Sequence, residues 1–94
     1  MVTLIQKVRL KNKMGLHTRP ATSIVKLLQT SKSEVLFTHK KETVSARSIL
    51  SILMLAVSNN SQITISVTGE DAQETMDRLL EGFRTCFGEG ALGV

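Results

Sequence analysis

The sequence has few of the residues that build cross-linked or base-stacking small proteins. It contains one cysteine, Cys86, one proline, and no tryptophan or tyrosine. One cysteine cannot form an internal disulfide, and it cannot supply the usual set of nitrogen and sulfur ligands for a metal. The only aromatic residues among Phe, Trp and Tyr are three phenylalanines, so few side chains are available to stack on exposed bases. A disulfide framework and a structural zinc site are therefore excluded, and a platform for single-stranded nucleic acid is disfavoured.

Long apolar segments are also missing. The longest apolar run, 49–57, is interrupted by Ser51, and it is much shorter than the roughly 20 residues that cross a bilayer. The first six residues contain no basic segment followed by an apolar one, which is the pattern of an export signal. We therefore expect a cytoplasmic protein with no membrane insertion.

The length and composition indicate one folded domain. The chain has 94 residues, of which 41% are hydrophobic and 21% charged. This is enough apolar material for one core and too little chain for two domains. We expect a single domain over 1–94, with the glycine-rich segment 88–94 as a flexible tail.

Charge is divided unevenly along the chain. Residues 1–47 hold ten basic and two acidic residues, whereas residues 48–94 hold two basic and six acidic residues. A basic half suggests an anionic partner, which could be nucleic acid, an acidic protein face or a phosphate group. A solvated surface without any partner is the alternative.

Alternation of apolar and polar residues predicts four strands. The second and third strands along the chain are joined by His39-Lys40-Lys41 as a hairpin without the usual glycine. His39 in this turn is expected to be solvated. The predicted strands cover 2–10, 34–38, 42–45 and 62–68.

Apolar residues at helical spacing predict three helices. The first has Pro20 in its first turn, where the missing N–H costs little. The second, 46–55, could by periodicity be a buried strand, but its alanine, leucine and methionine content favours a helix that opens at Ser45 or Ala46. The resulting order β-α-β-β-α-β-α predicts a two-layer α+β sandwich with the helices on one side. The apolar faces of the first and third helices are Ala21, Ile24, Val25 and Leu28, and Ala72, Met76, Leu79, Leu80 and Phe83.

The most informative segment is Gly15-Leu16-His17-Thr18-Arg19-Pro20-Ala21. It places His17 and Arg19 where a loop becomes a helix, and the free N–H groups and the dipole of a helix N-terminus attract anions there. The same dipole favours a neutral imidazole, which is a competent nucleophile. Arg19 could neutralise phosphate oxygens, and Gly15 would allow the sharp turn before His17. These residues describe a phosphoryl acceptor, and a solvent-exposed histidine at an ordinary helix start is the plainer interpretation.

This segment, together with Val44-Ser45-Ala46-Arg47-Ser48-Ile49-Leu50, resembles the histidine-containing phosphocarrier family HPr of the bacterial phosphoenolpyruvate-dependent sugar phosphotransferase system. The resemblance implies an open-faced sandwich, with a four-stranded antiparallel sheet and three helices on one face. It implies that His17 takes a phosphoryl group on Nδ1 from enzyme I and passes it to the IIA domains of sugar permeases. Arg19 would neutralise the phosphate, and Gly15, Leu16 and Thr18 would form the phosphate-binding loop and helix start. The chain would be a carrier and monomer rather than a turnover enzyme, without metal or cofactor.

The second segment implies regulation and docking. Ser48 would be a phosphosite for an HPr kinase/phosphorylase, although it could also simply cap a helix. Ile49, Leu50 and Leu53, or a subset of them, would form an apolar docking patch beside His17, although at helical spacing some of them must be core. The basic residues Arg19, Lys26 and Arg47 would rim this patch and suit an acidic face on enzyme I.

Other functions stay open at this point. A paralogue in a nitrogen-related or purely regulatory phosphorelay would keep the fold and change the partners. An RNA-binding α+β domain would use the basic half, but it leaves His17 and Arg19 unexplained. An independent hydrolase or transferase is disfavoured because the sequence pairs no second acid or base with His17. Met14, Ala56 and Asn60 depart from the family pattern, the last two replacing residues that are often glycine.

Overall fold

Most of the elements form where the alternating and helical patterns predict them. The computed structural model describes residues 1–89. Its elements, in chain order, are β1 (Val2–Arg9), α1 (Thr18–Leu28), β2 (Glu34–His39), β3 (Glu42–Ser45), α2 (Ile49–Met54), β4 (Gln62–Gly69), α3 (Ala72–Arg84) and a final 3-10 turn, η1 (Cys86–Gly88). No helix within this part of the chain is long and apolar enough to cross a membrane.

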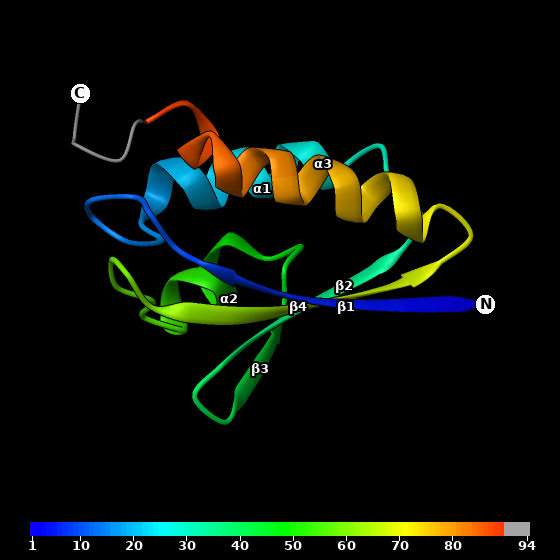
Figure 1. Cartoon of the computed structure of the whole chain (residues 1–94), viewed down its shortest axis with the longest axis horizontal. Coiled ribbons are helices and arrows are strands. Elements are labelled where there is room, and N and C mark those ends of the chain that lie inside the picture. Colours follow the sequence, from blue (N-terminus) through cyan, green and yellow to red (C-terminus); the bar gives the residue numbers. More distant parts are fainter. Residues whose placement is uncertain (90–94) are drawn as a thin grey trace.

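The four strands form one antiparallel sheet in the order β1-β4-β2-β3. Helices α1 and α3 lie side by side over one face (Figure 1), and α2 contacts α1 and β3. Apolar residues of alternate parity, such as Phe37 and its β4 partner Ile65, are fully buried beneath the helices. The opposite parity leaves Ile5 exposed on the other face. The predicted α+β open-faced sandwich is confirmed.

The prediction for His39 is wrong. His39 is the last residue of β2 and only 8% exposed, and its Nδ1 lies 3.2 Å from the carbonyl oxygen of Leu55. Val35, Phe37 and His39 share one parity, so the strand turns His39 toward the core. The connection is only Lys40-Lys41, with φ of 53° and 96°, and this pair of left-handed residues is typical of a two-residue hairpin turn.

Helix α2 begins later than predicted. Ala46 is fully buried, and its N–H donates to the carbonyl of Val35 at 2.9 Å, which continues the contact with the sheet. The N-cap is Ser48, whose Oγ accepts a hydrogen bond from the N–H of Ser51 at 3.2 Å. A serine is a favoured N-cap because its oxygen satisfies a free N–H of the first turn.

The predicted flexible tail, 88–94, is described only at its first two residues. Both continue the preceding turn: the N–H of Gly88 donates to the carbonyl of Thr85, and the N–H of Glu89 to that of Cys86. These two residues are therefore part of the fold, and residues 90–94 lie outside the described chain.

A polar cluster holds the loop between α1 and β2. The guanidinium of Arg47 donates to the carbonyls of Leu28, Ser31 and Ser33 at 2.7–2.8 Å, and the first of these belongs to the end of α1. Asp71, the residue before α3, accepts from Ser33 Oγ at 2.5 Å and from the N–H of Lys32 at 2.8 Å. The hydrogen bond from Ser33, followed by the one from Lys32, lowers the pKa of Asp71.

We predict that Asp71→Asn lowers the free energy of unfolding near neutral pH, because the amide replaces one acceptor oxygen with a donor. A lowered pKa in the folded state stabilises the protein above the pKa of the unfolded state, and the gain is lost as the pH falls through the folded value. Urea unfolding of both proteins at several pH values checks this. The difference should shrink in acid, and a difference that does not change with pH would contradict the role of the charge.

Ala56, which follows α2, has the left-handed backbone of a helix C-terminus. Its φ is +53°, and its N–H donates to the carbonyl of Leu53 at 3.1 Å. Glycine is favoured at this position because a Cβ makes the left-handed conformation costly. Asn60 has a φ of +68°, which asparagine tolerates better.

We predict that Ala56→Gly raises the free energy of unfolding by about 0.5–1 kcal/mol, the relief of left-handed strain less the added entropy of the unfolded chain. Ala56 is exposed, so no packing is lost. Chemical denaturation measures the change. A less stable variant would show that the backbone at this position is not strained.

Candidate functional site

His17 is placed by the beginning of α1. It is the N-cap residue, with an extended backbone, and its carbonyl accepts the N–H of Ala21 at 3.1 Å. Its side chain makes no capping hydrogen bond and is 29% exposed. The imidazole therefore stands at the helix N-terminus with part of its surface open to solvent.

The loop before His17 is fixed by its neighbours in the core. Leu16 is buried, and its N–H donates to the carbonyl of Val57 at 2.9 Å. Gly15 has a φ of +72°, and a Cβ there would collide with the carbonyl oxygen of Val57. Only glycine combines this backbone with this close approach. The sequence prediction that Gly15 allows a sharp turn is confirmed, and the contact with Val57 was not foreseen.

The first turn of α1 is suited to an anion. The N–H groups of Thr18 and Arg19 have no partner within a helix, and Pro20 has no N–H. The turn contains no acidic residue, so nothing in it offsets the positive end of the helix dipole. Arg19 is exposed, and within residues 1–89 its side chain makes no recorded hydrogen bond or ion pair. Its guanidinium is therefore available to a ligand.

One unpredicted residue completes the site. Oε2 of Glu89 lies 2.8 Å from Nε2 of His17, and Oε1 of Glu89 accepts a hydrogen bond from Nδ2 of Asn12 at 2.8 Å. Asn12 is fully buried and also donates to the carbonyl of Cys86 at 3.0 Å. The expectation that no acid or base pairs with His17 is thus wrong, because a distant part of the chain supplies one.

The chain reverses direction to bring Glu89 back. Cys86, Phe87 and Gly88 have φ of 56°, 49° and 85°. The ring of Phe87 packs edge-on against that of Phe83, with the two ring centroids 4.9 Å apart. Figure 1 shows the end of α3 and the following turn lying above the start of α1. Two left-handed residues that are not glycine give no turn signal in a sequence, so a pattern analysis could not place Glu89.

The α2 segment presents an apolar surface. Leu50 and Met54 are 67% and 71% exposed, one helical turn apart. Ile49 and Leu53 are half-buried and pack against the core. Of the three apolar residues predicted from the sequence for docking, only Leu50 is largely exposed, and the equally exposed Met54 was not among them. Leu50, Met54, Ile49 and Leu53 together are called the α2 patch below.

The basic residues predicted around this patch differ in their surroundings. Lys26 is exposed in the last turn of α1, seven residues and so two turns after Arg19. The guanidinium of Arg47, in contrast, is bound to the three backbone carbonyls described above. Arg19 and Lys26 share one side of α1, and Arg47 has a structural task.

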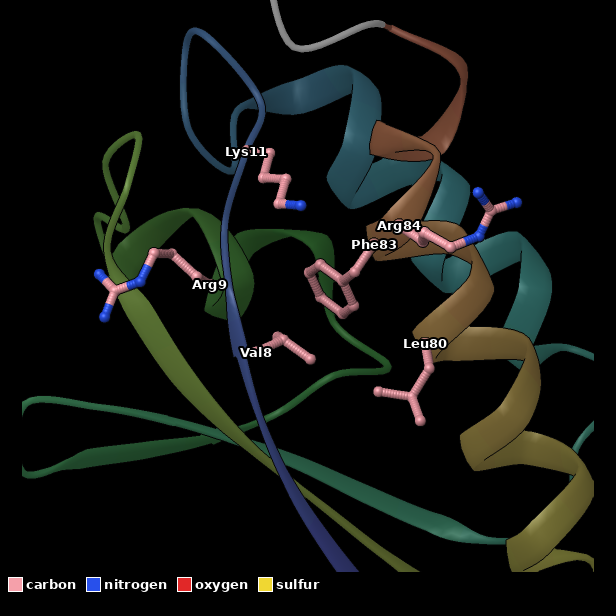
Figure 2. Close-up of a pocket in the computed structure, with 6 residues that line it drawn as sticks. All are labelled: Val8, Arg9, Lys11, Leu80, Phe83 and Arg84. Atoms are coloured by element: carbon pink, nitrogen blue, oxygen red, sulfur yellow. The ribbon is translucent and has the colours of Figure 1, made fainter.

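A hollow of about 220 Å³ lies elsewhere, between β1 and α3. Figure 2 shows Val8, Leu80 and Phe83 facing it, with Lys11 pointing in and the guanidinium groups of Arg9 and Arg84 pointing away. Arg84 is bound to Glu81, and their hydrogen bond lowers the pKa of Glu81. None of the site residues lines this hollow.

Within residues 1–89 no group of three or more His, Cys, Asp or Glu side chains could hold a metal ion.

Comparison with known proteins identifies the family of this chain. Residues 5–85 match the family model described as "PTS HPr component phosphorylation site". The chain is 45% identical over 80 residues to the phosphocarrier protein HPr of Chlamydia muridarum, covering 85% of this chain and 77% of that protein. It is 33% identical over 89 residues to the phosphocarrier protein NPr of Escherichia coli K12, covering 94% and 99%.

A solved structure named HPr has a similar fold. A crystal structure of HPr-C-His from Thermoanaerobacter tengcongensis superposes with a TM-score of 0.86 at 31% identity, covering 96% of this chain and 99% of that one. The family match includes the His17 segment and gives no support to the RNA-binding alternative. The chain belongs to the HPr phosphocarrier family of the phosphotransferase system.

Proposed function

We propose that this protein accepts a phosphoryl group on His17 from phosphorylated enzyme I and donates it to IIA components of sugar permeases. The observation that carries the proposal is the position of His17 as the N-cap of α1, partly open to solvent and above a helix turn without acidic residues. The protein acts as a cytoplasmic carrier, being both acceptor and donor, and needs no metal or cofactor of its own.

The residues around His17 have separate tasks in the transfer. The N–H groups of Thr18 and Arg19 and the guanidinium of Arg19 bind the phosphoryl oxygens, with hydrogen bonds strengthened by charge. Gly15 and Leu16 hold the loop so that the ring does not have to be ordered during transfer. Phosphoryl transfer depends mainly on positioning and charge neutralisation, which these groups supply.

The α2 patch is the proposed docking surface for enzyme I and the IIA components. Leu50 and Met54 expose apolar area of the kind that marks protein interfaces. The patch adjoins the site because α2 contacts α1 and is followed by Val57, which contacts the His17 loop. Arg19 and Lys26 add positive charge that attracts an acidic partner face. The same role for Arg47 stays a prediction. Its guanidinium already donates to three backbone carbonyls.

Ser48 is proposed as a second, regulatory phosphosite for an HPr kinase/phosphorylase. It is partly exposed and lies directly before Ile49 and Leu50 of the patch. A phosphate of about −2 charge there would be stabilised by the N–H groups of the helix start and would repel an acidic partner. Docking of enzyme I would weaken, while residue 48 would still cap the start of α2.

A nitrogen-related or purely regulatory phosphorelay is the second candidate function. Its support is the similarity to E. coli NPr across 94% of this chain. The chemistry at His17 would be the same and only the partners would change. Comparing the transfer rates from a sugar-system and a nitrogen-system enzyme I separates the two functions.

We predict that His17→Ala abolishes labelling by radioactive phosphoenolpyruvate in the presence of enzyme I. The label on the wild-type protein should be lost in acid and survive in base, as expected for a phosphorus–nitrogen bond. His39→Ala is the matched control, because its ring is buried at the end of β2. Label that persists in His17→Ala, with enzyme I active on another HPr, would contradict the proposal.

We predict that Leu50→Ser weakens binding to enzyme I by about 1–2 kcal/mol, or roughly tenfold, because one exposed apolar contact is lost. Ile5→Ser is the control, since Ile5 is 62% exposed on the uncovered face of the sheet. Titration calorimetry measures both. Equal effects of the two substitutions would show that the α2 patch is not the docking surface.

A further inference from the structure

The two nitrogens of the His17 ring have different surroundings. Nε2 lies 2.8 Å from Oε2 of Glu89. Within residues 1–89, Nδ1 has no recorded hydrogen-bond partner. An ionised carboxylate can only accept hydrogen bonds. Facing an ionised carboxylate, a neutral ring would hold its proton on Nε2 and leave the lone pair on Nδ1.

Glu89 is itself held in place. Asn12 donates to Oε1 of Glu89 at 2.8 Å and to the carbonyl of Cys86 at 3.0 Å, so its amide binds the carboxylate and the turn before it. The carbonyl of Asn12 in turn accepts the N–H of Gly15 and the side-chain amide of Asn59. The amide group that orients Glu89 thus belongs to the loop that leads to His17.

Burial strengthens this arrangement. Asn12 is fully buried, and the Glu89 side chain is only 15% exposed. A charge-assisted hydrogen bond shielded from water is stronger and more directional than one at an open surface. Glu89 can therefore bias the position of a proton on the ring, which an ordinary surface ion pair does weakly.

We propose that Glu89, oriented by Asn12, is a positioning residue that keeps His17 in the Nε2–H tautomer and directs Nδ1 toward the phosphoryl donor. The inference deepens the proposed function and rests on it. Neither the family match nor the names of the relatives assign a role to Glu89.

The contact also acts during the transfer. The lone pair of Nδ1 forms the new bond to phosphorus, while the bond from phosphorus to the donor breaks and its electron pair returns to the donor. The ring gains positive charge, and the proton on Nε2 stays in place. The hydrogen bond to the carboxylate becomes stronger as the charge develops, as it does for other histidines paired with a carboxylate.

The test is the tautomer of His17 in the full chain labelled with ¹⁵N-histidine, followed by NMR at a pH of about 8.5, where histidine is ordinarily neutral. In the wild-type protein we expect the Nε2–H form to predominate. In Glu89→Gln we expect the ratio of the two tautomers to fall at least about fivefold, because a neutral amide is a weaker acceptor than a carboxylate. Glu81→Gln removes the same charge from an exposed pair with Arg84 and should leave the ratio unchanged.

The rate of phosphorylation by enzyme I is the second readout, and we expect it to fall in Glu89→Gln. An unchanged tautomer ratio in Glu89→Gln would overturn the proposal and leave the contact as a structural link only. If the ratio changes but even the wild-type protein accepts no phosphoryl group, Glu89 still sets the tautomer of His17, whereas the proposed function fails and with it the role of Glu89 in the transfer. The two failures are therefore distinguishable.

Discussion

The site depends on one backbone contact, between the loop that precedes α1 and the carbonyl of Val57. Leu16 anchors this loop in the core, and Gly15 allows the two backbones to approach. A side chain at position 15 would push the loop away, and the start of α1 would shift with it. Because His17 is the N-cap of that helix, the contact sets the position of the ring relative to the free N–H groups.

The site combines groups of opposite charge. The helix start and Arg19 provide positive charge suited to phosphoryl oxygens, whereas Glu89 provides negative charge at Nε2. A carboxylate among the phosphate ligands would repel the group being transferred. In this structure Asn12 binds one oxygen of Glu89, while the other oxygen faces Nε2. One histidine can thereby attract an anion and still have its own positive charge stabilised.

Most of the fold could be predicted because its signals are local. The alternation of Ile63, Ile65 and Val67 and the helical spacing of Ala21, Ile24 and Leu28 are visible in the sequence, and these residues are buried as expected. His39 was misjudged because Lys40-Lys41 suggested a solvated turn, although the parity of β2 places the ring inward. Glu89 could not be found, since its approach to His17 depends on a reversal of the chain that begins at Cys86 and Phe87, two left-handed residues that are not glycine.

Identifying the atom that carries the phosphoryl group is the most direct test of how this site works. The ¹⁵N-labelled protein would be phosphorylated with phosphoenolpyruvate and enzyme I, and the scalar coupling between ³¹P and the ring nitrogens of His17 would be measured by NMR. We expect coupling to Nδ1, with the proton retained on Nε2 next to Glu89. Coupling to Nε2, or phosphate on another residue, would contradict the assignment of His17 as a carrier through Nδ1.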